Sequence, residues 1–551
     1  MIKTFDKHRT RAQESTAAIE RIYITMRHLF IRGFYKPMGI SGSTLRESLL
    51  ALRPEIYGSI AEPKVELNGL LYIMERLPLG IEECRFINLT SDEGYANSHF
   101  QAIIPQKRRR NCYRIDDEQM NIEITRGRSD IYDILTHLTF LFIESHKIMN
   151  SVLLENGKGV TRDWEKLKIA VEKPKLTRNE QEVAITHTAN ILGRTFNEVY
   201  SIYSSFSTQD DEHRFLKLIY FLGQLALAEH LHNEKRVITF SPVLRERLGH
   251  HLHGELWANT IKSKLEHNNL LNRKIHIISA NMHSVMNTLY AKDALKQYCK
   301  DKSNLDVFEA LSKDKNERLR QKVKEYALKN GMIFIPDASG TNIDVQLFDL
   351  SHITKQKDDA VIIVMDYAFG EQAYETMDEL LKPYTNKENK KQYLDVDSIS
   401  IMGKAGILEG GKGDIMIPNA HLFEGTADNY PFQNELNLKD FEGYDLGVFD
   451  GSMVTVLGTS LQNKDLLEFF HESTWDVIGL EMEGAHYQKA IQAASKLRGN
   501  IGANVKVRYA YYASDNPLET GSTLASGGLG TTGVKPTYLI TEKIIDQILG
   551  K

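Results

Sequence analysis

Two short acidic segments near the end of the chain hold the residue types best suited to chemistry. Residues 479–485 have the sequence GLEMEGA and supply Glu481 and Glu483, and residues 511–517 have the sequence YYASDNP and supply Asp515. A carboxylate pair can accept hydrogen bonds from sugar hydroxyls, and a lone carboxylic acid can protonate a leaving group. Together these groups suit the cleavage of a bond between a ribose and a base.

These carboxyl groups need a scaffold that brings them together. The first segment is expected to open a helix, and the second ends the apolar run 505–513, which predicts a buried strand. Open α/β folds bind their ligands at the carboxyl ends of the strands. We therefore expect the three carboxyl groups at one edge of a sheet.

Length and composition indicate a soluble protein with more than one domain. The chain has 551 residues, of which 42% are hydrophobic and 26% are charged, as in ordinary globular proteins. Its formal net charge of -5 argues against nucleic acid as a partner, because general nucleic-acid binders have a basic bias.

The cysteines and the N-terminus bear on location. Cys84, Cys112 and Cys299 are far apart and form no metal or disulfide pattern, which fits a reducing compartment. The N-terminus lacks the apolar core of a signal peptide, and no apolar run approaches the roughly 20 residues that cross a bilayer. We expect a cytoplasmic protein that does not bind a membrane.

The first part of the chain, residues 1–270, is expected to form a mainly α-helical region of unknown role. Apolar residues at helical spacing predict helices at 11–34, 131–149, 177–206 and 212–230, with strand-like patches at 100–104 and 120–124.

The second part, residues 271–551, alternates strand-like runs with helical patterns. This alternation predicts an α/β catalytic domain with a mostly parallel or mixed sheet. Its strands are expected at 273–280, 332–335, 360–365, 398–402, 414–417, 453–457 and 505–513, and its helices at 300–330, 371–381 and 461–470.

Several motifs in this second part occur in an order that resembles a known family. They are IHIISANM (275–282), VIIV with AFGEQA (361–373), MGKAGIL with GDIMIP (402–418), EMEGA (481–485) and the Ser514-Asp515 pair. In this order they resemble the type I nucleoside phosphorylase and nucleosidase superfamily. The resemblance implies a mixed sheet flanked by helices, and cleavage of an N-glycosidic bond.

Within that superfamily the chain is most similar to AMP nucleosidases. Residues 514–518 (SDNPL) resemble the SDKPL sequence of those enzymes, and residues 124–130 (ITRGRSD) resemble part of their N-terminal domain. The family forms dimers, trimers and hexamers, so a homo-oligomer is expected. The resemblance implies no metal and no organic cofactor, with inorganic phosphate as a possible co-substrate.

The resemblance also assigns roles to the acidic segments. Asp515 would protonate the purine, which requires a pKa raised by a sheltered site; the alternative is a carboxylate that caps a turn. Glu483 would accept hydrogen bonds from the ribose hydroxyls, and Met482 would pack under the sugar. Glu481 would either help to hold the sugar or interact favourably with the positive end of the helix dipole. The remaining candidate substrate ligands are Ser514 and Thr455.

Residues 403–406 are expected to form a Gly-x-x-Gly turn that could bind an anion through its bare backbone. The candidate ligands are Gly403, Lys404, Ala405 and Gly406. In the phosphorylases of the family a hydroxyl residue of this turn contacts inorganic phosphate, and Lys404 stands at the matching position. The alternative is a tight turn that needs glycine for backbone reasons alone.

The chain departs from the phosphorylases where those enzymes bind phosphate. Ile401 stands at the position of an arginine, and residues 280–284 lack both the glycine-arginine loop and the acidic residue that small nucleosidases place near water. His283 could replace that base, although a lone histidine is more often structural. These departures favour hydrolysis over phosphorolysis, or a site that has lost activity.

Three further segments have open interpretations. Residues 520–533, rich in glycine and hydroxyls, could form a mobile lid, a loop that binds a 5′-phosphate, or a surface loop. The basic run 107–110 is either a solvated loop or a contact for a nucleotide phosphate. The histidines at 229–232 and 250–253 lack the spacing of a metal site and are expected at solvated helix ends.

The sequence thus predicts cleavage of the N-glycosidic bond of a purine nucleotide or nucleoside by water. AMP is the first candidate, and its hydrolysis would give adenine and ribose 5-phosphate. Two alternatives stay open. One is a phosphate-dependent purine nucleoside phosphorylase, and the other is a non-catalytic protein that senses a nucleotide.

Overall fold

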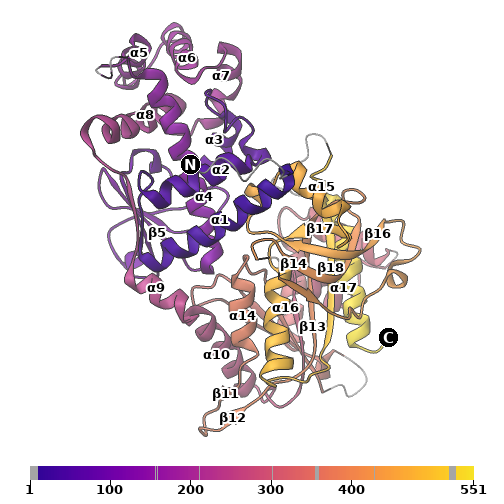
Figure 1. The fold of residues 1–551 in the computed structure, drawn as a ribbon. Coiled ribbons are helices and arrows are strands. Elements are labelled where there is room, and N and C mark those ends of the chain that lie inside the picture. The colour runs from indigo at the N-terminus through magenta and orange to yellow at the C-terminus, as the bar shows by residue number, and fades with distance from the viewer. Residues whose placement is uncertain are drawn as a thin grey trace. The chain divides into compact units, whose positions relative to one another are not determined.

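The computed structural model describes residues 10–155, 157, 159–209, 211–300, 302–353, 359–426, 428–519 and 529–551. The chain forms two compact units (Figure 1). Unit 1 consists of Met1–Ile124, Asp130–Gly249 and Ser460–Asn463, and unit 2 consists of Thr125–Ser129, His250–Thr459 and Lys464–Lys551. In the described part of the chain no helix is both long and apolar enough to cross a membrane.

Unit 1 is mainly helical, as predicted, and also contains a small sheet. Its helices are α1 (Arg11–Arg32), α2 (Ile40–Leu52), α3 (Leu67–Met74), most of α4 (Gly127–Val152), α5 (Arg162–Val171), α6 (Arg178–Leu192), α7 (Phe196–Tyr203), α8 (Arg214–His232) and α9 (Pro242–Gly249). The sheet has the order β1 (Phe34–Tyr35), β6 (Val237–Phe240), β2 (Phe86–Thr90), β5 (Gln119–Glu123), β4 (Cys112–Arg114) and β3 (Ala102–Ile103).

The single helix predicted for 177–206 is wrong, because a left-handed cap interrupts it. Gly193 has a φ of 64° and ends α6, and its N–H bonds back to the carbonyls of the last turn. Thr195 then starts α7 through a capping box with Glu198. Glycine at such a C-terminal position costs little strain, since it has no Cβ.

Unit 2 contains a mixed sheet of ten strands, which confirms the predicted fold class. The order is β15 (Asn429–Pro431), β14 (Ile415–Phe423), β16 (Val448–Thr455), β17 (Val477–Glu481), β13 (Asp395–Ile407), β7 (Lys274–Ser279), β10 (Val361–Met365), β9 (Val345–Asp349) and β8 (Met332–Ile335), and β18 (Lys506–Asp515) pairs with both β13 and β14. Strands β7, β10, β13 and β18 run parallel, whereas β17 is antiparallel to β13.

Helices cover both faces of this sheet. They are α10 (Leu252–His267), α11 (Met282–Ala294), α12 (Asn304–Lys313), α13 (Arg318–Lys329), α14 (Gln372–Leu380), α15 (Lys464–Glu472), α16 (Gly484–Gln492) and α17 (Val534–Ile548). The predicted helix 300–330 is therefore two helices, α12 and α13.

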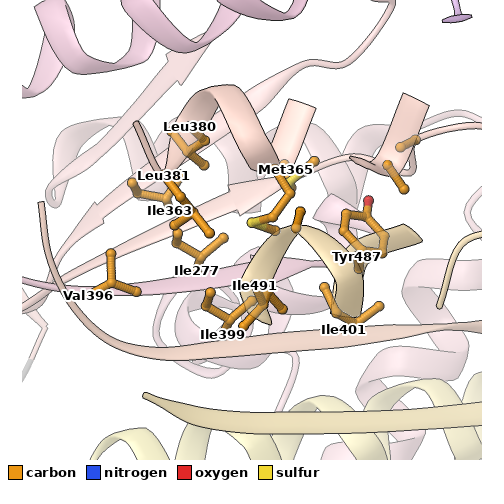
Figure 2. Packing of buried hydrophobic residues seen from close by; sticks show 14 of the residues in the cluster. Ile277, Ile363, Met365, Leu380, Leu381, Val396, Ile399, Ile401, Tyr487 and Ile491 are labelled. Atoms are coloured by element: carbon orange, nitrogen blue, oxygen red, sulfur yellow. The ribbon is translucent and has the colours of Figure 1, made fainter. Parts of the chain in front are cut away.

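The alternation of side chains along the central strands creates two cores. Ile277 and Ile363 pack with α10, α14 and α16 on one face, as Figure 2 shows for part of this cluster. Their chain neighbours Ile278 and Ile362 pack with α11, α12, α13 and α17 on the other face. Successive residues of a strand point to opposite faces, so these unbroken apolar runs are buried on both sides.

The compact unit 2 starts before the boundary predicted at residue 270. Helix α10 belongs to it because Trp257, Ile261 and Leu265 are buried in the core beneath α14. The tryptophan indole also donates a hydrogen bond to the Ile343 carbonyl, with an N–O distance of 2.9 Å.

Replacing Leu265 tests whether α10 is part of this core. Leu265 is fully buried, whereas Leu256 of the same helix is 54% exposed. We expect Leu265→Ala to lower the free energy of unfolding by about 3 kcal/mol, through lost burial and a residual cavity. The matched change Leu256→Ala should stay within about 0.5 kcal/mol of the native value. Denaturant unfolding and calorimetry measure both, and equal effects would place α10 outside the core.

Candidate active site

A cavity of about 300 Å³ lies in unit 2, where the parallel strands end. It brings together the sequence-predicted residues 403–406, Glu481, Met482, Glu483 and Ser514. The rest of its lining is Ser279, Tyr367, Ala368, Ile401, Met402, Thr459, Leu480, Tyr487, Tyr511 and Tyr512. The cavity therefore lies at the edge of the sheet where the sequence predicted the site.

The turn predicted for residues 403–406 is wrong, because these residues continue strand β13. Gly403, Lys404 and Ala405 pair with β18, and Gly406 pairs with both β18 and β17. Their backbone groups therefore belong to a sheet ladder and do not form a nest of free N–H groups. A Cβ on Gly403 would lie 3.5 Å from a ring carbon of Tyr367, which is an ordinary van der Waals contact, so neither close packing nor a turn requires glycine here.

A β-bulge places the two residues of the Ser-Asp motif. The register of β13 and β18 shifts after Ala405, so that Ala405 pairs with Ala513 and Gly406 pairs with Asp515. Ser514 is the extra residue. Bulges redirect side chains at the ends of strands. Here Ser514 lines the cavity, whereas the next residue, Asp515, is buried and is not part of the lining.

Asp515 is well placed to hold a proton. The side chain is 7% exposed, and among the described residues its Oδ2 has no hydrogen-bond partner. Burial raises the pKa of Asp515 above its ordinary value, against the lowering effects of Ser514, Lys404 and Lys412. A buried, unpartnered carboxylate oxygen is costly, whereas a protonated carboxyl group is not.

The Ser514 hydroxyl lies between the Ala405 carbonyl and the Asp515 carboxyl group. Its Oγ lies 3.0 Å from the carbonyl oxygen of Ala405 and contacts Asp515 Oδ1. The hydroxyl has a single proton to donate. The hydroxyl proton is therefore shared between two acceptors, and its donation to Asp515 only partly offsets the effect of burial on the Asp515 pKa.

Glu481 is surrounded by donors. Its side chain accepts hydrogen bonds from the Thr455 hydroxyl and from the N–H groups of Glu483 and Gly484. These contacts cap the N-terminus of α16. Burial raises the pKa of Glu481 to about 7, although the three hydrogen bonds lower it.

Thr455 supports Glu481 from behind. Its side chain is fully buried, and its Oγ1 also accepts a hydrogen bond of 2.8 Å from the Ala485 N–H. This placement favours a supporting role for Thr455 and Glu481 over direct contact with a ligand.

Glu483 has a different environment, although it is only two residues away. It lines the cavity, and its Oε1 accepts a hydrogen bond of 2.8 Å from the Gly370 N–H. Burial and then the neighbouring Glu481 raise the pKa of Glu483 to about 8. Hydrogen bonds from a ligand would therefore relieve the desolvation of this carboxyl group.

The turn that holds Glu483 is in turn held by residues from far back in the chain. Gly370 has a φ of 55°, and a Cβ there would overlap Ser129 Oγ. The Glu371 N–H donates to Ser129 Oγ over 2.8 Å, and Arg128 pairs with the Glu371 carboxylate at 3.2 Å. Sequence analysis found only a resemblance in 124–130 and missed this supporting contact.

Tyrosines form much of the remaining wall. Tyr367, Tyr487, Tyr511 and Tyr512 line the cavity, and the Tyr487 hydroxyl lies 3.0 Å from Ser279 Oγ. Flat aromatic surfaces suit stacking against a planar base. From the sequence, Tyr511 and Tyr512 were predicted only as strand residues. A tyrosine pair at the end of an apolar run is the sequence feature that could have indicated their place at a binding site.

None of the described histidines lines this cavity. His421 is buried behind it, contacts the Tyr511 hydroxyl at 3.2 Å, and has a pKa lowered to about 3 by burial. His283, the proposed alternative base, lines a neighbouring hollow. Among the described residues, one group of potential metal ligands lies within 4.8 Å, namely His251, Asp378 and Glu379. Lys382 and Arg498 already pair with those carboxylates.

Two other sequence interpretations stay predictions. Most of the glycine-rich segment 520–533 lies outside the described residues, which resume at Leu529. In the basic run 107–110, the side chains of Arg108 and Arg110 pair with Asp133 within unit 1. These pairs favour a structural role for the run.

The fold and the site together define an α/β unit with a cavity lined by carboxylates and tyrosines. The chain belongs to a family of unknown function (DUF6909), whose model matches residues 43–550. No curated protein matches the chain.

Solved structures similar to this chain are nucleosidases and a phosphorylase, the class that the motifs resemble. The 5'-methylthioadenosine/S-adenosyl homocysteine nucleosidase of Campylobacter jejuni is 12% identical, with 51% of this chain and 100% of that chain covered and a TM-score of 0.31. The futalosine hydrolase of Helicobacter pylori strain 26695 is 12% identical, with 51% and 99% covered and a TM-score of 0.31. Uridine phosphorylase isoform 2 of Schistosoma mansoni is 12% identical, with 50% and 90% covered and a TM-score of 0.30. Because these scores are low, the functional assignment rests on the geometry of the site.

The raised pKa of Glu483 predicts a pH-dependent stability. Because the folded value of about 8 lies above the ordinary 4.5, the stabilisation is full below 4.5 and is lost as the pH rises through 8. One proton corresponds to a slope of about 1.4 kcal/mol per pH unit in that window. We expect Glu483→Gln to reduce this slope, measured by denaturant unfolding at several pH values.

A matched control uses an exposed glutamate of the same unit. Glu409 is exposed, and Glu409→Gln should leave the slope unchanged. A slope that is the same in Glu483→Gln and in the native protein would show that Glu483 ionises normally in the folded state.

Proposed function

We propose that this protein cleaves the N-glycosidic bond of a purine nucleoside or nucleotide. The observation that supports this best is that one carboxyl group lines the cavity and a second, buried one follows a cavity residue directly in the chain. Glu483 lines the cavity, and the buried Asp515 follows the cavity residue Ser514. One group suits hydrogen bonding to a sugar, and the other suits proton donation.

The ribose would bind at Glu483 and Met482. The ionised form of Glu483, which prevails above its pKa of about 8, would accept hydrogen bonds from the 2′- and 3′-hydroxyls. Its charge would favour the positive character that develops on the ribose as the bond breaks. The side chain of Met482 is half-buried at the cavity and offers an adaptable apolar surface for the sugar. The base would lie among the tyrosines.

Asp515 would act as the general acid. Its proton would pass to N7 of the purine while the electron pair of the C1′–N9 bond moves onto the base, which then leaves as a neutral molecule. The oxygen of a water molecule would form the new bond to C1′, and the proton that this water loses would restore the acid through solvent. Retention of a proton near neutral pH requires the raised pKa that burial gives to Asp515.

Water is the proposed acceptor, and AMP is the first candidate substrate. Ile401 lines the cavity where phosphorylases have an arginine, which disfavours inorganic phosphate as the nucleophile. Phosphorolysis remains the second candidate because the cation of Lys404 also lines this cavity. A cytoplasmic location, a homo-oligomeric state and independence from metals are further predictions.

Base release tests the reaction and its acid. The native chain should release adenine from AMP without added phosphate, as measured by chromatography over a panel of purine nucleosides and their monophosphates. Asp515→Asn should lower kcat by about 100-fold or more, since this is the usual contribution of a general acid. The control Asp450→Asn changes an exposed aspartate of the same unit and should retain activity. Release only with added phosphate would identify a phosphorylase, and tight binding without release would favour a sensor.

The two glutamates should differ when each is replaced by glutamine. Glu483→Gln should lower kcat/KM by about tenfold or more with a modest change in Tm, because the lost interactions are those with substrate. Glu481→Gln should lower Tm more, because Glu481 accepts hydrogen bonds from three groups of the protein. Steady-state kinetics and calorimetry on both variants measure this contrast, and the reverse order would exchange the two roles.

A further inference from the structure

A second hollow of about 310 Å³ adjoins the candidate active site. The two share Lys404 and Tyr512 as lining residues, so they meet at this part of the wall. The hollow is otherwise lined from α11, α12, α13 and α17 by Asn281, His283, Ser284, Met286, Asn287, Leu311, Ser312, Arg320, Leu529, Gly530, Gly533, Val534, Thr537 and Tyr538. Its walls thus include the helices of the segment 300–330, which sequence analysis treated only as a charged insertion.

The hollow has a positive character. Arg320 and Lys404 line it, and the described lining contains no carboxylate to balance their charges. The pKa of His283 is lowered by partial burial and then by the charges of Arg320 and Lys324, while Asp366 and Glu317 oppose this effect. The cations of Arg320 and Lys324 near His283 add to the positive character of this side of the hollow.

Arg320 is held in a fixed position. Its Nε donates to the Leu311 carbonyl at 2.8 Å, and its Nη2 donates to the Ser312 carbonyl at 3.1 Å. Its Nη1 lies 4.0 Å from the exposed Glu317 carboxylate, which is at the limit of an ion pair. A planar guanidinium fixed in this way retains donors for phosphate oxygens.

A buried amide in the same wall has spare hydrogen-bonding capacity. Asn287 is 4% exposed, and its Nδ2 donates a hydrogen bond of 2.7 Å to the Tyr538 hydroxyl, whereas its Oδ1 has no partner among the described residues. The tyrosine hydroxyl can donate or accept, so the amide can turn over and present its NH2 group to the hollow. This unpartnered group points to a polar ligand in the hollow.

We propose that the hollow binds the phosphate group of the substrate, with Arg320 and Lys404 as its cationic ligands. This inference rests on the proposed function, since it places the 5′ end of a nucleotide beside the ribose at Glu483. Lys404 lines both cavities, so one molecule can occupy them together. The protein would thereby select a nucleotide over a nucleoside. A free phosphate ion has the same chemistry, and the experiment separates the two sources.

The test compares AMP with adenosine as substrates of Arg320→Gln, Lys404→Gln and Lys322→Gln. The ratio of kcat/KM for AMP to that for adenosine should fall about tenfold or more in the first two variants, as loss of a charge-assisted hydrogen bond predicts. Lys404 is exposed, so its replacement should leave the fold intact even if Arg320→Gln loosens the link between α12 and α13. Lys322, an exposed residue of α13 outside the lining, is the matched control and should keep the native ratio.

A binding measurement keeps this proposal separate from the catalytic one. Titration calorimetry with ribose 5-phosphate should show binding that weakens in the same two variants. If the native chain releases no base but this pattern of binding holds, the proposed function fails and the phosphate site stands. Equal binding, or an unchanged substrate ratio, in all variants would overturn the phosphate site. Adenosine cleavage that requires inorganic phosphate, with a raised KM for phosphate in both variants, would assign the hollow to the free ion and overturn the ester.

Discussion

The candidate site depends on how Glu481 is buried at the start of α16. Its carboxylate accepts the N–H groups of Glu483 and Gly484 and the Thr455 hydroxyl, which fixes the turn between β17 and α16. This turn needs glycine at position 484, because a Cβ there would overlap the ring of His421. Because the turn is fixed, the Glu483 side chain lies on the cavity side, where it accepts a hydrogen bond from the Gly370 N–H. A carboxylate held by the protein thus orients the one that lines the cavity.

The other half of the site depends on strand register. Parallel pairing of β13 with β18 would continue past Ala405, but the extra residue Ser514 interrupts it and sets Asp515 opposite Gly406. The bulge leaves a carboxyl oxygen buried with no partner in the part of the chain that the structure describes, which is a cost to folding that a regular strand would not incur. Such local violations are expected where a protein needs a perturbed pKa.

The elements with strong local signals could be predicted from the sequence. The predicted bounds of strand β8 are those of the structure. The acidic motifs were predicted at the edge of the sheet where the cavity lies. The errors arose where local signals are ambiguous or distant. The glycines of 403–406 suggested a turn, but pairing on both sides keeps them in a strand. Ser129 and Glu371 are far apart in the chain, and Arg320 lies in a charged helix whose inner face no spacing rule distinguishes.

The three carboxyl groups differ mainly in how many donors the protein gives them. Glu481 has three, Glu483 receives the Gly370 N–H at the cavity, and Asp515 receives the Ser514 hydroxyl at Oδ1 while its Oδ2 has no partner among the described residues. Burial alone would raise the pKa of all three, so the donors decide what each group can do. A carboxylate saturated by the protein has little left to offer a substrate. Glu483 and Asp515 each keep capacity for further hydrogen bonds, and burial favours the protonated form of both. The separation of roles therefore follows from local hydrogen bonding on a shared sheet edge.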